Sequence, residues 1–176
     1  YVFPVIVKPK PDGKSEKIAL INWGTEASND PDIIEAMVTS QSRKPAWQYA
    51  THVGVSCEPS HIWVVDEDKP GAAGELNLPE TLIMATRRGR HYVYKAADFD
   101  QRNTEGFPVP DVDIRANGGM FVVYGQVIHD ADIAPWPFPK ILVESERPKP
   151  EARSDFFDLN NATYKTIEDF KRLWGG

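Results

Sequence analysis

Short apolar runs separated by turn residues make up most of the sequence. The first two runs, Val2 to Val7 and Ile18 to Asn22, flank a turn over Pro9 to Gly13, and this pattern predicts a strand, a turn and a second strand. Runs of the same kind predict further strands at 52–56, 62–66, 82–86, 91–95, 112–115 and 120–124. Runs of this length, bounded by turn residues, are typical of a sheet-rich protein.

Helical patterns occur at two places. Asn29 or Asp30 can accept the first free N–H groups of a helix, and Pro31 suits its first turn. The apolar residues of this helix share one face and are Ile33, Ile34, Met37 and Val38. A last helix is predicted near the C-terminus, where Thr166 is followed three residues later by Asp169.

Proline is the unusual feature of the composition. The 176 residues include 15 prolines, or about 8.5%, compared with an average of about 5%. This excess argues against long helices. Three of the prolines lie in 133–139, which we expect to cross the surface irregularly because it cannot continue a central strand or a helix. The order of elements predicts a single α+β domain over 1–176 with a mostly antiparallel sheet.

The net charge and the cysteine content limit the type of partner and the cellular compartment that we expect. A net charge of −6 argues against a protein that coats nucleic acid through a broad basic surface. The single cysteine, Cys57, cannot form an intrachain disulfide, and no apolar run approaches the roughly 18 residues of a membrane helix. We therefore expect a cytoplasmic protein with no membrane partner. Because a strand pattern is already under way at Tyr1, and the chain stops at Gly176, we expect a piece of a longer protein.

An aspartate pair ends the apolar strand that starts at Ile62. Side chains alternate along a strand, so Asp66 and Asp68 project to the same side while Glu67 points away. Two carboxylates at this spacing can bind a hard cation such as Mg²⁺ or Mn²⁺. A solvated strand end that leads into a turn explains the same residues without any metal.

A basic segment follows at 86–95. It has five potential positive charges, Arg87, Arg88, Arg90, His91 and Lys95, and no acidic residue. Such a segment suits a triphosphate or a nucleic-acid backbone, because the planar guanidinium of arginine matches phosphate oxygens. A solvated basic hairpin is the structural alternative.

A third polar segment lies at 111–119. Asp111, Asp113 and Arg115 share one face of a short strand, and Asn117-Gly118-Gly119 allows a turn with positive φ angles. An exposed polar strand face followed by a hairpin turn explains this segment equally well.

The order of the three segments resembles a known family. An aspartate pair, a Thr-Arg-Arg-Gly-Arg-His turn and an Asp-Ile-Arg-x-x-Gly-Gly hairpin follow one another as in the bifunctional primase-polymerase (prim-pol) family of the archaeo-eukaryotic primase superfamily, found in phage and plasmid replication proteins. Upstream, 23–31 is similar to the tryptophan element of the family, and His52 to Val55 is similar to the strand before the aspartate pair. The resemblance covers roughly residues 1 to 130.

The resemblance implies a set of catalytic residues. The implied ligands of two divalent cations, Mg²⁺ or Mn²⁺, are Asp66, Asp68 and Asp113. Asp111 competes for the third position, and Asp113 is preferred because Ile114-Arg115 and Gly118-Gly119 follow it as in the family pattern.

The basic segment has an implied role as well. His91 corresponds to the histidine that contacts the incoming triphosphate, with Arg88 and Arg90 as helpers. The implied activity is a template-directed DNA primase and DNA polymerase that transfers nucleotides to a 3′-hydroxyl. The implied partners are dNTP or NTP, a single-stranded DNA template with its primer, and a helicase domain in the longer chain.

The resemblance also implies a subdivision of the archaeo-eukaryotic primase-like core. An N-terminal αβ unit over 1–57 would pack on a mostly antiparallel sheet like that of an RNA-recognition motif over 58–130. The remaining residues, 131–176, would form an extension with the terminal helix.

Two other functions stay open at this point. One is a non-catalytic module that binds single-stranded nucleic acid on four strand aromatics, Trp63, Tyr92, Tyr94 and Phe121. The other is a two-metal nuclease, because three carboxylates alone also suit phosphodiester hydrolysis.

Overall fold

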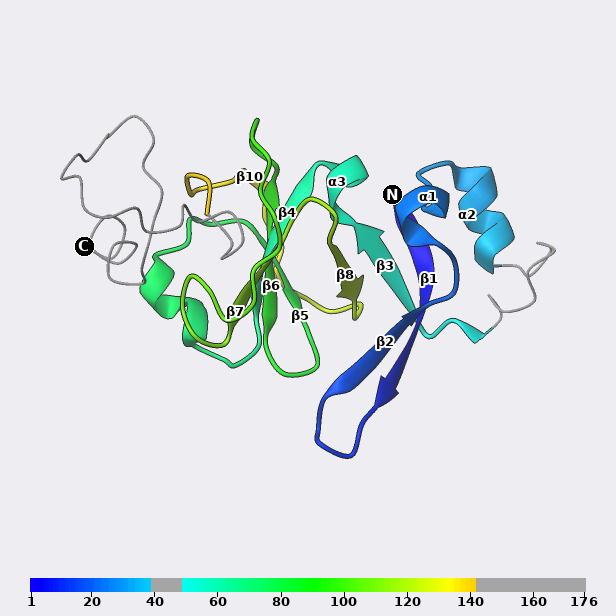
Figure 1. The fold of residues 1–176 in the computed structure, drawn as a ribbon, viewed down its shortest axis with the longest axis horizontal. Coiled ribbons are helices and arrows are strands. Elements are labelled where there is room, and N and C mark those ends of the chain that lie inside the picture. The colour runs from blue at the N-terminus through cyan, green and yellow to red at the C-terminus, as the bar shows by residue number, and fades with distance from the viewer. Residues whose placement is uncertain (39–48, 142–176) are drawn as a thin grey trace, which may run out of the picture.

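The structure is a computed structural model that describes residues 1–38 and 49–141 (Figure 1). Within these ranges the strands form two sheets. The first sheet has four antiparallel strands in the order β2-β1-β3-β8, with the bounds β1 (Val2–Pro9), β2 (Ser15–Ala19), β3 (His52–Ser56) and β8 (Met120–Val123). The α+β class with mostly antiparallel sheets is therefore confirmed.

The second sheet follows the order β7-β4-β6-β5-β9. Its strands are β4 (Ile62–Glu67), β5 (Leu82–Ala85), β6 (Arg90–Lys95), β7 (Val112–Arg115), β9 (Val127–His129) and β10 (Ala134–Pro135). The pairs along that order are antiparallel, whereas β10 pairs with β6 in parallel. The chain enters the second sheet at β4, returns to the first sheet for β8, and crosses back at β9.

The helices in the described residues are short. They are α1 (Trp23–Glu26), α2 (Pro31–Val38), α3 (Cys57–Ser60) and the 3-10 helix η2 (Ala72–Leu76). Helix α2 begins where the sequence predicts, and the Asp30 carboxylate accepts the N–H of Asp32 at 2.9 Å. None of the described helices is long and apolar enough to cross a membrane. The helix predicted at Thr166 lies outside the described residues.

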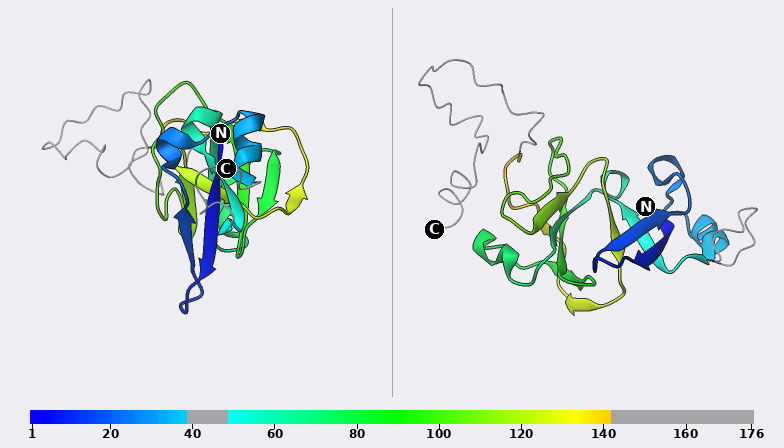
Figure 2. Two further views of the ribbon diagram at one scale, coloured as in Figure 1. Left: turned by 90° about the vertical axis from the view of Figure 1, so that its right-hand side faces the viewer. Right: turned by 60° about the horizontal axis from the view of Figure 1, so that its bottom comes forward.

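Three clusters of buried apolar residues stabilise the two sheets and the helices. The first lies between the first sheet and the helices, where Phe3 stacks on Trp23 with ring centroids 5.8 Å apart and Met37 is buried. The second joins the two sheets, because Val64 and Val93 of the second sheet pack with Phe121 of the first. Figure 2 shows the two sheets from two further directions.

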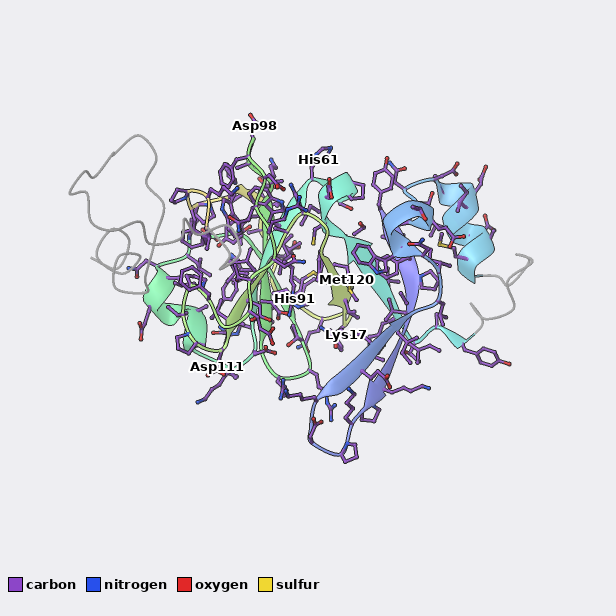
Figure 3. The ribbon with its side chains drawn as sticks, in the orientation of Figure 1. Lys17, His61, His91, Asp98, Asp111 and Met120 are labelled. Carbon is purple, nitrogen blue, oxygen red and sulfur yellow. The ribbon has the colours of Figure 1, made fainter. Side chains whose placement is uncertain are left out.

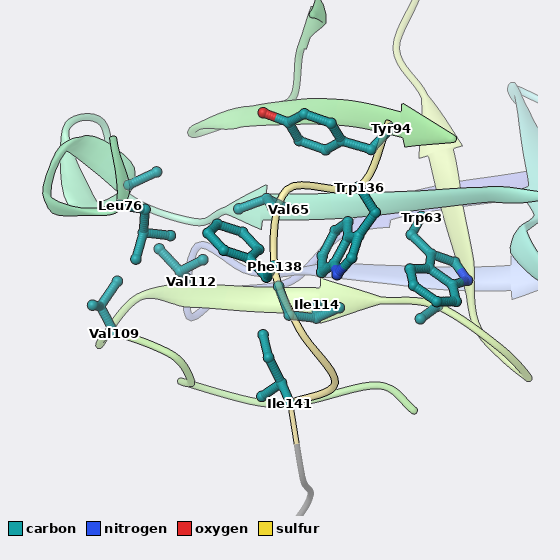
Figure 4. Packing of buried hydrophobic residues seen from close by; sticks show 12 residues of the cluster. Trp63, Val65, Leu76, Tyr94, Val109, Val112, Ile114, Trp136, Phe138 and Ile141 are labelled. Atoms are coloured by element: carbon teal, nitrogen blue, oxygen red, sulfur yellow. The ribbon is translucent and has the colours of Figure 1, made fainter. Parts of the chain in front are cut away.

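The third cluster covers the opposite face of the second sheet (Figure 4). Trp63 and Tyr94 are almost completely buried there, beneath Trp136, Phe138 and Ile141. The prediction that 133–139 continues neither a central strand nor a helix is confirmed, but the prediction of a surface crossing is wrong, because Trp136 and Phe138 are buried. The prolines do limit β10 to two residues at the parallel contact with β6, but the residues between the prolines are aromatic, and their burial drives the segment onto the sheet.

The β1–β2 hairpin is longer than the sequence predicts. Strand β2 begins at Ser15 rather than at Ile18, and it pairs with β1 as far as Pro9, which lies opposite Ser15. The turn is closed by two backbone hydrogen bonds, in which the N–H of Lys10 donates to the carbonyl of Lys14 and the N–H of Gly13 donates to the carbonyl of Lys10. The residues added at the start of β2, Ser15, Glu16 and Lys17, are polar and at least partly exposed, so no hydrophobic pattern marks them. The hairpin consequently extends past the rest of its sheet (Figures 1 and 2).

Candidate active site

Strand register brings three of the candidate residues into one row. Asp66 on β4 lies directly opposite His91 on β6 and directly opposite Asp113 on β7. Residues opposite each other in antiparallel strands project to the same side, so all three face the first sheet, as Val64 and Val93 do. The row lies at the end of β4 where Asp68 follows.

Arg115 connects the two carboxylates of this row. Its Nε lies 3.3 Å from Oδ2 of Asp66, and its Nη2 lies 2.5 Å from Oδ2 of Asp113. The other oxygens also have partners, since His91 Nε2 lies 3.2 Å from Asp66 Oδ1 and the N–H of Gly106 donates to Asp113 Oδ1 at 2.7 Å. Asp66 and Asp113 are both buried. Their charges are thus balanced inside the protein by one guanidinium and by hydrogen-bond donors.

The two buried aspartates differ in acidity. Burial by itself raises the pKa of Asp66, but the hydrogen bond and charge of His91, with the charges of Arg115 and Lys17, lower it to about 2. Burial raises the pKa of Asp113, and the negative charge of Asp66 acts in the same direction, although Gly106 and Arg115 oppose the shift. Asp66 is therefore the more strongly ionised member of the pair.

Asp68 lies at the solvent edge of the site. Its side chain is about half exposed and forms an ion pair with Arg88, with 3.5 Å between Oδ1 and Nη2. Its charge contributes to the raised pKa of Asp113, so the third carboxylate acts on the same site. The competing residue, Asp111, is exposed in the turn before β7, and its carbonyl accepts the N–H of Asp68 at 2.9 Å (Figure 3). Asp113, and not Asp111, therefore faces Asp66.

His91 is enclosed within the protein. Only 1% of its surface is exposed, and its ring meets Phe121 edge-on with centroids 5.4 Å apart. Its Nδ1 is buried without a hydrogen-bond partner among the described residues. In this arrangement His91 holds Asp66 through Nε2.

Arg90 lies on the opposite face of the sheet. It is the cross-strand neighbour of Glu67, and its Nε lies 3.9 Å from the Glu67 carboxylate. Glu67 is buried and accepts the N–H groups of Gly71 and Ala73 at 2.8 and 3.1 Å. The structure therefore separates Arg90 from the row of Asp66, His91 and Asp113, and joins it to the loop after β4.

The turn between β5 and β6 packs closely against the end of β4. A Cβ atom added to Gly89 would lie 1.7 Å from the carbonyl oxygen of Glu67, so only glycine fits there. Thr86 Oγ1 accepts the N–H of Gly89 at 2.9 Å and stabilises the turn. The close contact keeps Arg88 beside Asp68.

The first sheet adds two residues that no local pattern indicates. Lys17 on β2 lowers the pKa of Asp66, so its charge lies near the row. Burial raises the pKa of Tyr124, which follows β8, and the charge of Asp66 acts in the same direction. Both residues come from a different sheet, and only the packing of the two sheets brings them to this site.

The carboxylates of the site are ligands of the type that a hard divalent cation prefers, but they are not arranged as a complete metal-binding site. Carboxylate oxygens are the ligands that Mg²⁺ and Mn²⁺ prefer, and Asp66 and Asp113 face each other across two strands. Within 1–38 and 49–141, however, no group of three or more histidine, cysteine, aspartate or glutamate residues is arranged to hold a metal ion. Arg115 supplies positive charge between the two carboxylates instead.

The aromatic residues considered as stacking platforms are core residues. Trp63, Tyr94 and Phe121 have exposed fractions of 1%, 0% and 4%, and Tyr92 is half-buried. Bases need an open aromatic face on which to stack. The interpretation of these buried rings as a nucleic-acid platform is therefore wrong.

Comparison with known families identifies the family of the chain. The family model Prim-Pol, described as the N-terminal domain of bifunctional DNA primase/polymerase, matches residues 1–150. A search of curated proteins finds no match. The matched range contains both sheets and every residue of the candidate site.

Proposed function

Because the chain belongs to the Prim-Pol family of bifunctional DNA primases/polymerases, we propose that it transfers nucleotides from dNTP or NTP to a 3′-hydroxyl under the direction of a DNA template. The observation that carries this proposal is the pair of buried carboxylates, Asp66 and Asp113, that face each other beside a basic turn. Phosphoryl transfer depends on positioning and on neutralisation of negative charge, and this arrangement has groups suited to both.

Asp66, Asp68 and Asp113 are the residues proposed to hold two divalent cations. Two Mg²⁺ or Mn²⁺ ions bound there would align the 3′-hydroxyl with the triphosphate and neutralise the charge that develops during transfer. The low pKa of Asp66, about 2, keeps that carboxylate ionised and ready to bind a cation at neutral pH. Asp68 would join from the solvent side, where its side chain is half exposed.

Arg88 is proposed to contact the nucleotide directly, whereas His91, which is 1% exposed, is proposed to act on it through Asp66. Arg88 is half exposed beside Asp68, so its guanidinium can exchange that carboxylate for a phosphate oxygen. His91 orients Asp66 through Nε2 and retains an unpartnered Nδ1. Arg90 remains a predicted helper, although it contacts Glu67 on the face of the sheet opposite to Asp66 and His91.

The decisive experiment is primer extension by Asp66→Asn and Asp113→Asn. Each substitution keeps the shape of the side chain and removes the charge proposed to hold a cation, so we expect incorporation to fall by about 100-fold or more. Asp98→Asn is the matched control, because Asp98 is exposed and lies far from His91 (Figure 3). Circular dichroism checks that all three variants fold. Near-wild-type extension by either site variant would contradict the metal-site assignment.

A nuclease is the second candidate, and the same carboxylates favour it. The basic turn distinguishes the two, because hydrolysis of a phosphodiester needs no triphosphate site. Incubation of labelled primer–template with Mn²⁺ separates them: growth of the primer only when dNTP is present supports the polymerase, and shortening without dNTP supports the nuclease.

The wider setting is also part of the proposal. The family resemblance implies a role in the replication of a phage or plasmid, together with a helicase domain. Extension assays on single-stranded templates with and without a primer would show whether these 176 residues start chains or only lengthen them.

A further inference from the structure

Positive side chains outside the candidate site gather along the β1–β2 hairpin and the adjacent turn. We define the hairpin strip as Lys10, Lys14, Lys17, Arg87 and Arg88. The three lysines are exposed on the hairpin, and the two arginines are exposed in the turn between β5 and β6. The chain as a whole has a net charge of −6, so the positive charge of the strip is a local feature of the surface.

Hydrogen bonds fix the turn against the hairpin. Arg87 Nη1 donates to the carbonyl of Lys14 at 3.0 Å and to Oγ of Ser15 at 3.1 Å. These residues are far apart in the sequence and belong to different sheets. The basic turn is therefore held against the hairpin, and Arg87 lies on the side of β2 that Ser15 and Lys17 share.

The acidic residues nearby leave most of the strip unneutralised. The Asp12 carboxylate accepts the N–H of Lys14 within the turn, and Glu16 lies opposite Lys8 across the hairpin. Arg88 shares Asp68. Among the residues that the structure describes, no carboxylate lies within ion-pair distance of the lysine side chains of the strip.

The strip extends from the hairpin turn, where the N–H of Lys10 donates to the carbonyl of Lys14, along β2 to Lys17. A run of exposed positive side chains along a protruding hairpin suits a polymer of phosphates. At its inner end the strip reaches the candidate site, because Arg88 forms an ion pair with Asp68 and the charge of Lys17 acts on Asp66.

We propose that the hairpin strip binds the sugar–phosphate backbone of the primer–template and guides it to Asp66 and Asp113. This inference rests on the proposed function and adds the surface on which the DNA lies. The strip ends beside Asp68, one of the carboxylates of the proposed catalytic site, which favours a nucleic acid over an acidic protein. Backbone contacts by lysine and arginine supply affinity without sequence preference, as a template-directed enzyme requires.

The test compares DNA binding by the 176-residue chain and by a Lys10→Gln/Lys14→Gln variant. Fluorescence anisotropy of a fluorescein-labelled primer–template is measured over a series of salt concentrations. Each lost phosphate contact lowers the slope of log K against log salt by about 0.7 to 0.9. We expect the slope to fall by about 1.5 and the affinity to fall by about tenfold at low salt.

The matched control is Lys95→Gln/Arg102→Gln. It removes the same number of positive charges from the opposite end of the second sheet, where Lys95 lies across from Ile62 and Arg102 bridges to Asn117. We expect this control to bind within about twofold of the unmodified chain. Thermal unfolding checks that both double variants fold. A hairpin variant that binds DNA as the control does would overturn the inference.

Primer extension separates this inference from the proposed function. At saturating primer–template we expect the hairpin variant to reach the wild-type rate, with a raised KM for DNA, because Lys10 and Lys14 lie outside the candidate site. If the unmodified chain extends primers and the hairpin variant shows no change in KM, only the strip is wrong. If the unmodified chain binds DNA through the strip but shows no metal-dependent extension, the proposed function fails and the strip stands.

Discussion

At the scale of single residues, Arg115 organises the candidate site. It is the one side chain that contacts both Asp66 and Asp113 among the residues that the structure describes. Two buried carboxylates on neighbouring strands repel each other, and a guanidinium between them removes that repulsion. A divalent cation bound as proposed would supply the same positive charge between the carboxylates as Arg115 does.

Arg115→Gln tests this balance. The variant leaves Asp66 and Asp113 facing each other without a counter-charge, and we expect it to lose about 3 kcal/mol of stability in EDTA. Added Mn²⁺ should raise the melting temperature of the variant more than that of the wild type, because the ion replaces the missing charge. Differential scanning fluorimetry measures both effects. Arg102→Gln is the control, since its ion pair with Asp100 is half exposed and contributes little.

The outcome for Arg115→Gln is informative in both directions. A variant as stable as the wild type in EDTA would mean that the two aspartates do not depend on the guanidinium. A Mn²⁺ effect equal to that on the wild type would mean that no cation binds between the carboxylates.

The sequence predicts individual site residues better than their partners. Alternation along a strand places Asp66 on one face, and the structure agrees. The row of Asp66, His91 and Asp113 depends on which strands are neighbours and on their register, and one sequence contains no direct record of either. The position of Arg90 could have been predicted, because alternation along a strand places it on the face opposite to its neighbour His91. The roles of all six candidate residues in catalysis and nucleotide binding stay predictions.

At the scale of elements, hydrophobic patterns predict the strands that are buried and miss those that are not. The strands around Val64, Val93 and Phe121 are confirmed because their apolar side chains form cores. Strand β9 is missed because it has only three residues, with Val127 and Ile128 about half exposed. Backbone pairing at a sheet edge needs no particular side chain, so it leaves no pattern in the sequence.

The turn between β5 and β6 provides an element-scale prediction. Gly89→Ala would place a Cβ against the carbonyl oxygen of Glu67, and the turn would have to move away from β4. We expect a loss of about 1 to 3 kcal/mol in the free energy of unfolding, with weaker nucleotide binding as Arg88 moves from Asp68. Chemical denaturation and titration with labelled dNTP measure the two effects.

Gly74→Ala is the matched control for the turn. Gly74 lies in η2, and no atom lies within 4 Å of the position that its Cβ would take. The same chemical change should therefore leave stability and nucleotide binding close to wild type. Equal behaviour of the two alanine variants would mean that the turn does not pack on β4 as described.

At the scale of the whole molecule, the one cysteine reports on the contact between the sheets. Cys57 is completely buried beside Val64, Val93 and Phe121, and burial raises the pKa of its thiol to about 12, although Arg115 acts in the opposite direction. A buried, protonated thiol is unreactive. We expect no reaction with Ellman's reagent at pH 8 over minutes, and complete reaction of one thiol in guanidinium chloride. Rapid labelling of the native protein would mean that the sheets separate readily.

The crossing of β8 into the first sheet has a consequence for how the chain folds. Strand β3 has β8 as its outer neighbour, and β4 to β7 lie between the two in the sequence. During synthesis from the N-terminus, β3 therefore waits with an open edge until almost the whole second sheet has emerged. Pairings this distant in sequence are slow to form, because the loop between them must first be closed. The first sheet is thus begun first and completed late, and its last strand arrives directly after the segment that contains Asp113.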